Sequence, residues 1–196
     1  MPAMSHRKRC MSGLPMPCCR CDVPDLNSRH GIAAMSTLAG PVVAHADARH
    51  LDALMNVMRA SFDPLYGEAW SALQLGGSLG QTGSFARQAL DRDSFTAGFT
   101  LSRAAGPEVE LLLIAVRPEY RGRGFGRMLL EAACNDALRR GASDVFLEVR
   151  ENNLPARELY RRIGFIDVGR RADYYAGSSG DRYAAITMRR RLDDLT

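Results

Sequence analysis

The chain has 196 residues, 46% of them apolar, so it can bury one core of ordinary size, and we expect a single domain with a tail. No apolar run approaches the roughly 18 residues that a transmembrane helix needs, so we expect a soluble protein with no membrane partner. The net charge of +4 and the sequence pI of about 9.0 would suit a nucleic-acid-binding protein, and the position of the charge decides that question.

Most of the excess charge and most of the cysteines lie in the first 34 residues. Five basic and two acidic side chains give this leader a charge of +3, which leaves +1 for the rest of the chain, so we expect no basic face for DNA or RNA. The leader cysteines are Cys10, Cys18, Cys19 and Cys21. Even with His30 as a further ligand, the C-x-x-C pair lacks the second matched pair typical of structural zinc sites, so we expect no metal.

We expect residues 1–40 to be a disordered leader and residues 41–196 to form one domain. The leader does not have the pattern of a secretory signal, and a translation start at Met35 is an alternative. The remaining cysteine, Cys134, lies in a predicted helix as an ordinary small apolar residue. This use of cysteine suits a reducing cytoplasm.

The domain begins with predicted helices. Asp47 is a suitable N-cap, and apolar residues then recur at helical spacing to about Ser61. A shorter helix is predicted around Trp70 and Leu73, whereas residues 76–83, reading GGSLGQTG, are predicted as a loop.

The middle of the chain predicts a sheet. Residues 84–90, 94–101 and 108–116 have the composition of strands joined by short turns, which predicts an antiparallel meander. A helix over 124–140 then leads to a strand over 144–150. This strand–helix–strand unit predicts a parallel pair, so the sheet should be mixed.

The last elements complete an α+β domain. A helix over 154–163 is predicted to begin after Asn153 as N-cap and to end at Gly164. Residues 165–169 and 183–190 are predicted as the last two strands. The predicted order is three strands, a helix, a strand, a helix and two strands, behind one or two leading helices. This order indicates the α+β class.

A glycine-rich turn over residues 121–126, reading RGRGFG, joins a buried strand to an amphipathic helix. Such a turn points several backbone N–H groups at one spot, where the helix N-terminus adds partial positive charge. The nucleotide P-loop is excluded because no lysine follows Lys8. The dinucleotide fingerprint is excluded because the glycines fall at 122, 124 and 126. We therefore expect a cradle for phosphate.

This turn belongs to the first of three informative stretches. They read IAVRPEYRGRGFGRMLLE at 114–131, FLEVRENNLPARELYRRIGF at 146–165, and RRADYY with GDRYAAITM between 170 and 188. Together they resemble the GNAT acetyltransferases, and among these the RimI-type ribosomal-protein alanine N-acetyltransferases. The resemblance implies a GNAT-like mixed, mostly antiparallel sheet of about six to seven strands, with a splayed parallel pair and flanking helices. It also implies an N-acetyltransferase that uses acetyl-CoA.

By this resemblance, the backbone of Ile114, Ala115 and Val116 would bond the pantetheine arm in the gap between the splayed strands. A backbone N–H aimed at the thioester oxygen would stabilise the developing oxyanion. The glycine turn and the start of the helix after the second strand of the pair would hold the rest of the cofactor. These residues are Arg121, Gly122, Arg123, Gly124, Phe125, Gly126, Arg127, Asn153 and Arg157. As plain sequence, Asn153 is equally well explained as a helix cap, and the arginines as solvated side chains.

The resemblance assigns Glu148 as the general base, acting through water, and Tyr160 as the general acid for the departing thiolate. Glu148 shares a strand face with Phe146 and Arg150, and a carboxylate among apolar neighbours is a better base near neutral pH. From the residues alone, a surface pair of Glu148 with Arg150 and a tyrosine at the edge of the core are the alternatives.

The acceptor is predicted to be a protein N-terminus. Tyr174 and Tyr175, in a predicted loop, resemble the wall over the substrate terminus in the RimI-type enzymes. An α-amine has a pKa of about 8 and a lysine amine one of about 10.4, so one modest base suffices for a terminus. We expect direct acetyl transfer, with no acyl-enzyme on Cys134, to the N-terminal alanine of a small-subunit ribosomal protein. The alternatives are a small-molecule amine such as a polyamine or aminoglycoside, a non-catalytic acyl-CoA-binding module, and an arginine-rich RNA-associated module.

Overall fold

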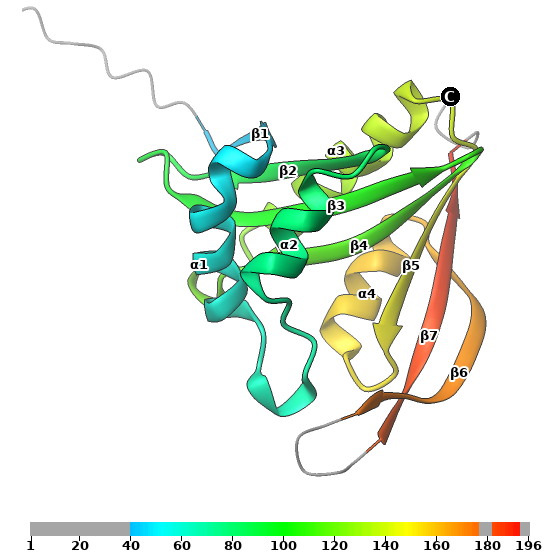
Figure 1. The fold of residues 1–196 in the computed structure, drawn as a ribbon. Helices are drawn as coiled ribbons and strands as arrows, with labels where there is room; N and C mark the ends of the chain where they lie inside the picture. The colour runs from blue at the N-terminus through cyan, green and yellow to red at the C-terminus, as the bar shows by residue number, and fades with distance from the viewer. Residues whose placement is uncertain (1–39, 177–181, 193–196) are drawn as a thin grey trace, which may run out of the picture. The chain divides into compact units, whose positions relative to one another are not determined.

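The computed structural model describes residues 40–176 and 182–192, and Figure 1 shows their fold. The predicted leader, with its four cysteines and His30, lies outside the described residues apart from Gly40. The strands are β1 (Val42–Ala46), β2 (Ser84–Leu90), β3 (Thr96–Ala105), β4 (Glu108–Val116), β5 (Asp144–Arg150), β6 (Ile166–Ala176) and β7 (Arg182–Arg191). The α-helices are α1 (Leu51–Ser61), α2 (Ala72–Leu79), α3 (Phe125–Arg139) and α4 (Leu154–Arg162). Short 3₁₀ turns are η1 (Ala48–His50), η2 (Pro64–Tyr66) and η3 (Pro118–Tyr120).

The described strands form one seven-stranded sheet in the order β1-β2-β3-β4-β5-β7-β6. Neighbouring strands are antiparallel except for β4 and β5, which are parallel. The predicted meander, the parallel pair and the mostly antiparallel sheet are therefore confirmed. β1 was not predicted, because its five residues form an edge strand whose partner, β2, lies some forty residues further along the chain.

A β-bulge at Leu112 divides β4 into two halves. Leu111 lies opposite Ser102 and Leu113 lies opposite Leu101, so Leu112 is an extra residue on β4. An extra residue moves the side chains that follow to the other face of the sheet. Val109 and Leu111 accordingly pack with α3, whereas Leu113 and Ala115 pack with α1.

Helices cover both faces of the sheet (Figure 1). On one face, α1 and α2 bury Leu54, Val57, Met58 and Leu75 against the sheet residues. On the other face, α3 and α4 pack together over a second core, which includes Leu130, Ala133, Ala137, Tyr160 and Ile163. Among the described residues, no helix has both the length and the apolar content needed to cross a lipid bilayer.

Part of the predicted loop over 76–83 is helical, which corrects the sequence prediction. Ser71 and Gln74 form a capping box that starts α2, and Leu75 is fully buried. Gly76 lies where α2 crosses α1, because a Cβ at this position would stand 3.3 Å from Leu51 Cδ2. Glycine therefore allows close helix packing here, whereas a run rich in glycine is more often typical of a loop.

The region of Tyr174 and Tyr175 was predicted as a loop, but both residues lie in β6. Arg171 pairs with Ala185 and Tyr175 with Tyr183, so β6 carries two more residues than β7 between these points. Asp173 has a φ of +54° within this bulge. The bulge turns the side chains of β6 away from regular alternation and towards the end of β5.

Candidate active site

The pairing of β4 with β5 stops at the bulge. The last parallel pair is Leu111 with Leu147, although β4 continues to Val116 and β5 to Arg150. Figure 1 shows the two strands close at one end and parted at the other. The predicted splayed pair is thus confirmed, and the bulge at Leu112 supplies its physical cause, because it bends β4 away from β5.

The backbone of β4 beyond the bulge is open towards the gap. Arg117 N–H donates to Ala97 O of β3 at 2.9 Å, so the alternation of an antiparallel ladder points the polar groups of Ala115 towards β3. The same alternation points those of Ile114 and Val116 towards β5. Of the three predicted pantetheine contacts on β4, Ile114 and Val116 therefore face the gap with their backbone, and Ala115 faces away from it.

The glycine turn leads directly into α3. Gly122 and Gly124 have φ values of +73° and +87°, a region that favours glycine, and a Cβ on either would meet no atom within 4 Å. Gly124 is the N-cap of α3, and no side chain caps the helix. The first N–H groups of a helix have no intrahelical partner, so they are available to a phosphate group that approaches this open side. The geometry fits the predicted diphosphate cradle.

The arginines of the turn differ in what they contact. Arg121 donates to Val116 O at 3.1 Å and to Ser61 O at 2.9 Å, so it ties the turn to the ends of β4 and α1. Arg123 lies with its guanidinium 5.8 Å from the ring centroid of Tyr120. Arg127 is exposed and pairs with Glu131 at 2.7 Å, one helical turn further along α3. Arg123 and Arg127 are hence freer than Arg121 to move towards a phosphate.

Phe125 and Gly126 lie in the first turn of α3 and pack against neighbouring elements. The Phe125 ring is buried and lies edge-on to the Tyr120 ring, with centroids 5.3 Å apart. A Cβ on Gly126 would stand 3.0 Å from Leu159 Cδ2, so this glycine lets α4 approach α3. Both residues position the turn, and only their backbone N–H groups are suited to contact a cofactor.

The predicted contacts on α4 have structural roles in this conformation. Asn153 is the N-cap of α4, and its Oδ1 accepts from Ala156 N–H at 3.3 Å. Arg157 donates to Glu151 O and to Asp167 Oδ2, each at 2.9 Å. The helix-cap alternative for Asn153 is therefore what the geometry shows, and cofactor contact by either residue stays a prediction.

Glu148 lies at the fork of the splayed strands. It follows Leu147, the last β5 residue paired with β4, and its carboxylate is 3.1 Å from Arg171 Nη1. A hydrogen bond from the Tyr174 hydroxyl to the Glu148 carboxylate is the main cause that raises the pKa of Tyr174. The expected apolar surroundings are incorrect, since both these neighbours are polar. The proposed surface pair of Glu148 with Arg150 is also wrong, because Arg150 binds another carboxylate.

Tyr160 lies on the opposite face of the sheet from Glu148, close enough to Tyr175 and Glu68 to interact with them electrostatically. Its ring is buried in the core between α3 and α4, 5.9 Å from the Phe165 centroid. Burial raises the pKa of Tyr160, and electrostatic interaction with Tyr175 and Glu68 raises it further. The hydroxyl therefore stays protonated at physiological pH, which a general acid requires.

Tyr175 and Tyr174 close the site from β6. Their rings meet edge to face with centroids 5.1 Å apart, and Tyr174 is 49% exposed. Burial raises the pKa of Tyr175, and the charges of Glu68 and Glu148 add to the shift. The bulge therefore places Tyr174 in hydrogen-bond contact with Glu148, and a role of Tyr174 and Tyr175 as a substrate wall stays a prediction.

The sequence reasoning missed an ion pair between Glu68 and Arg150. Glu68 lies in the connection over residues 62–71, here named the α1–α2 loop, and its side chain is 16% exposed. Arg150 Nε is 2.8 Å from Glu68 Oε1, and Nη2 is 3.2 Å from Oε2. The two residues are 82 positions apart along the chain, so no local signal could pair them. The one hint available was an arginine at the end of an apolar strand.

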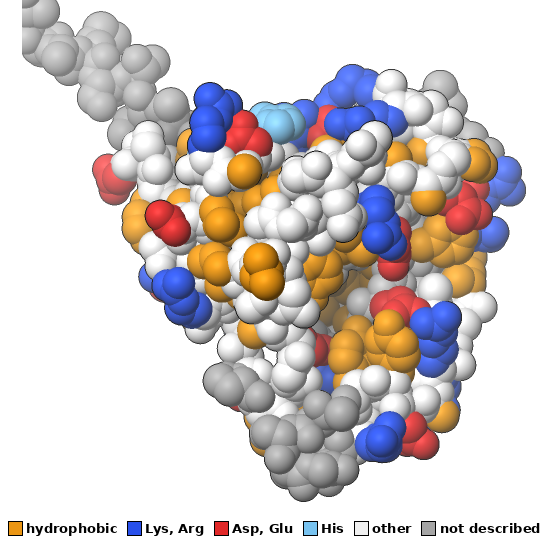
Figure 2. Space-filling model, viewed as in Figure 1, with side chains coloured by type: hydrophobic (Ala, Val, Ile, Leu, Met, Phe, Trp, Pro, Cys, Tyr) orange, Lys and Arg blue, Asp and Glu red, His pale blue; other side chains and the backbone are white. Residues whose placement is uncertain are grey.

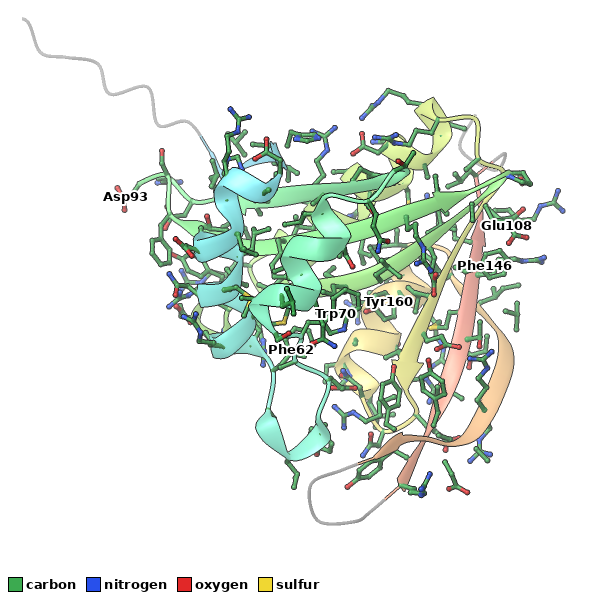
Figure 3. All side chains as sticks on the ribbon, in the orientation of Figure 1. Phe62, Trp70, Asp93, Glu108, Phe146 and Tyr160 are labelled. Carbon is green, nitrogen blue, oxygen red and sulfur yellow. The ribbon has the colours of Figure 1, made fainter. Side chains whose placement is uncertain are left out.

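These residues define two sides of the fork. We name the cofactor side as β4 beyond Leu112, the glycine turn and the first turn of α3. We name the acceptor side as the α1–α2 loop, the end of β5 and the facing ends of β6 and β7. In Figure 2 hydrophobic side chains are visible in a recess between the α1 and α2 region and the strands β5 and β7. Figure 3 labels Tyr160 and Trp70 in this central region. In the described part of the chain, no cluster of His, Cys, Asp or Glu has the makings of a metal site.

The fold and the fork define a member of a known class of enzymes. The model of the acetyltransferase (GNAT) family matches residues 51–165, which include the cofactor side and, on the acceptor side, the α1–α2 loop and the end of β5. The chain belongs to the GNAT family, and the predicted class of N-acetyltransferase is confirmed.

Within the family, the chain resembles particular enzymes. The chain is 41% identical over 91 residues to the [ribosomal protein bS18]-alanine N-acetyltransferase of Haemophilus influenzae, covering 46% of this chain and 62% of that protein. It is 34% identical over 117 residues to the enzyme of the same name from Salmonella typhimurium, covering 60% and 78%. The solved structure of the ribosomal-protein-S18-alanine N-acetyltransferase from Escherichia coli superposes with a TM-score of 0.69 at 27% identity, covering 78% of this chain and 94% of that one. The predicted likeness to the RimI-type enzymes is confirmed.

Proposed function

We propose that this protein transfers the acetyl group of acetyl-CoA to the N-terminal α-amine of a protein. The observation that carries the proposal is the position of Glu148 and Tyr160, which approach the fork of the splayed strands from opposite faces of the sheet. A carboxylate and a protonated phenol at one opening can accept the proton of an attacking amine and return one to a departing thiolate. The glycine turn next to the same gap suits the diphosphate of the coenzyme.

Each residue then has a definite task. Glu148, through water, takes the proton of the ammonium form so that the neutral amine can attack the thioester carbonyl. The backbone N–H groups of β4 that face the gap stabilise the oxyanion as it forms. Tyr160 donates its hydroxyl proton to the CoA sulfur as the carbon–sulfur bond breaks, and the proton that the nitrogen of the intermediate loses returns through water to Tyr160. The products are the acetylated amine and CoA, with the original ammonium proton passing from Glu148 to solvent.

Direct transfer is favoured over an acyl-enzyme. Cys134 is buried on α3, and burial raises the pKa of its thiol, so the thiolate needed for nucleophilic attack is disfavoured. Its side chain packs in the core between α3 and the sheet, away from the fork. The amine itself is accordingly the proposed nucleophile.

We propose an N-terminal alanine of a small-subunit ribosomal protein as the acceptor. The names of the bacterial relatives support this choice, and the wall of Tyr174 and Tyr175 provides aromatic surface for a short peptide terminus. An α-amine, with a pKa of about 8, asks less of the base than a lysine does. The reaction would take place in the cytoplasm, where acetyl-CoA and ribosomal proteins meet.

A small polycation such as a polyamine is less suited to the site. Glu68 and Glu148, two carboxylates of the acceptor side, each already have an arginine partner, Arg150 and Arg171. A second ammonium group would therefore meet carboxylates that are already neutralised and two fixed positive charges.

The test offers acetyl-CoA together with three acceptors and locates the label by mass spectrometry. The acceptors are a lysine-free peptide with a free N-terminal alanine, an N-terminally blocked peptide that contains lysine, and spermidine. We expect the label on the free alanine terminus, and its loss in Glu148→Gln. A label confined to lysine or to spermidine would reject the N-terminal acceptor while leaving the enzyme class intact. Binding of acetyl-CoA with no transfer to any acceptor would indicate a non-catalytic module.

A further inference from the structure

Arg150 joins three separate parts of the chain on the acceptor side. Besides the two bonds to Glu68, it donates to Asn152 Oδ1 at 3.0 Å. Its Cζ stands 3.4 Å from the ring centroid of Tyr66 and 5.9 Å from that of Tyr183. One buried guanidinium, 7% exposed, therefore contacts the α1–α2 loop, the turn after β5 and the start of β7.

The ion pair fixes the middle of the α1–α2 loop. At its ends the loop is anchored by Phe62 and Trp70, which pack on the core beneath α1 and α2 (Figure 3). Between them, Tyr66 packs edge-on against Tyr183 at 5.5 Å, and Glu68 holds Arg150 with both oxygens. Burial alone would lower the pKa of Arg150, but the Glu68 carboxylate raises it, so the guanidinium stays charged.

We propose that the Glu68–Arg150 pair is a latch that positions the α1–α2 loop as a wall of the acceptor site, and that acceptor affinity depends on it while acetyl-CoA affinity does not. The inference rests on the proposed function for its kinetic part. The geometric reason is that the loop is held by Arg150, which shares a face of β5 with Glu148, and by Tyr183 of β7, whereas the cofactor-side groups lie on β4, the glycine turn and α3. The latch residues are positioning residues, since the loop they hold, rather than their own chemistry, meets the acceptor.

The chain contains a matched pair that separates positioning from stability. Arg87 on β2 binds Asp136 on α3 with the same two-bond geometry, at 2.6 Å (Nε–Oδ2) and 2.7 Å (Nη2–Oδ1). The Arg87 and Asp136 side chains are largely buried, as those of the latch are, but they lie outside both sides of the fork. A change of this pair should lower stability without moving the acceptor site.

The first readout needs no substrate. Trp70 is the single tryptophan of the chain and stands at the end of the α1–α2 loop, so its fluorescence reports on the loop. We expect Glu68→Gln and Arg150→Met to increase quenching of Trp70 by acrylamide about twofold or more in the folded protein, because the loop opens locally. Asp136→Asn should leave the quenching unchanged. Equal quenching in folded latch variants and wild type would overturn the proposal, whatever the acceptor proves to be.

The second readout is steady-state kinetics with the alanine peptide. We expect Glu68→Gln to raise the acceptor KM about tenfold, with kcat changed less and acetyl-CoA binding by calorimetry unchanged. If Arg150→Met fails to fold, the double variant Glu68→Leu with Arg150→Met removes both charges, should restore folding, and should keep the raised KM. An unchanged acceptor KM in any folded latch variant, or an equal rise in Asp136→Asn, would overturn the latch. Absence of turnover in wild type would instead count against the proposed function and leave the Trp70 result to decide the latch.

Discussion

The two sides of the fork are built on different principles. The cofactor side is one continuous stretch, in which a bulged strand, a glycine turn and a helix N-terminus present mainly backbone groups. The acceptor side brings together segments from the α1–α2 loop, β5, β6 and β7 through side-chain contacts such as Glu68–Arg150 and Glu148–Arg171. Backbone groups suit a coenzyme that never changes, whereas side-chain contacts between segments can be altered to fit a different acceptor. The following predictions test this division.

The largest expected effect is on the chemistry at the fork. Glu148→Gln removes the proposed base and should lower kcat about 10²–10⁴-fold, since general-base catalysis contributes that much. Isothermal calorimetry should show unchanged acetyl-CoA binding, because Glu148 lies on the acceptor side. Glu158→Gln, an exposed position on α4 paired with Arg162, is the control and should leave kcat unchanged. Residual activity within threefold of wild type, roughly 0.7 kcal/mol of barrier, would remove Glu148 as the base.

The second prediction concerns the stability contributed by the Arg87–Asp136 pair, which lies outside both sides of the fork. Burial would raise the pKa of Asp136, but hydrogen bonds from Arg87 and Arg139 lower it overall. Because the folded pKa is depressed, the contribution of the pair is present above the unfolded value of about 3.9 and is lost as the pH falls below it.

Asp136→Asn should consequently lower the free energy of unfolding by about 1–3 kcal/mol at neutral pH. The loss should shrink as the pH drops below about 3.9, because the Asp136 carboxyl is then protonated in the unfolded wild type while it stays ionised in the folded protein, and this lowers the stability of wild type. Urea unfolding followed at several pH values measures it. A difference between wild type and variant that is the same at all pH values would contradict the ionised pair.

A third prediction probes the cofactor side through its glycines. Gly124 and Gly141 have similar φ values, +87° and +81°, and a Cβ on either meets no atom within 4 Å. Alanine at either should cost about 1–2 kcal/mol of stability from the left-handed backbone alone. Gly124→Ala should additionally weaken acetyl-CoA binding about tenfold, because its methyl group enters the open side of the turn. Equal coenzyme affinity in the two variants would show that the diphosphate does not bind at this turn.

The smallest expected effect concerns Arg127. Arg127→Ala should change stability by less than about 0.5 kcal/mol, because its pair with Glu131 is an exposed helical pair. Acetyl-CoA affinity should fall up to about fivefold, and less at high salt. Arg162→Ala, which breaks an equally exposed pair with Glu158, is the control and should leave the affinity unchanged. Identical affinities in both variants would show that Arg127 is a solvated side chain that does not contact the coenzyme.

The local sequence determined much of the cofactor side. The bounds of β2, β4 and β5 agree with the predicted strands, and α3 with the predicted helix to within one residue at each end. Apolar runs, glycines at positive φ and helix caps act over a few residues, so they can be read without knowing the rest of the fold. The resemblance of these same stretches to the GNAT family also pointed to Glu148 and Tyr160, whose catalytic roles stay predictions.

Only the tertiary structure decided the acceptor side. It placed β7 between β5 and β6, extended β6 through Tyr174 and Tyr175, and joined Glu68 to Arg150 across 82 positions of the chain. It also gave Glu148 the partner Arg171 in place of Arg150. Strand order, bulge position and ion pairs between distant segments depend on contacts between strands that are far apart in the sequence. These contacts form only when the whole sheet has assembled, so no short window of sequence encodes them.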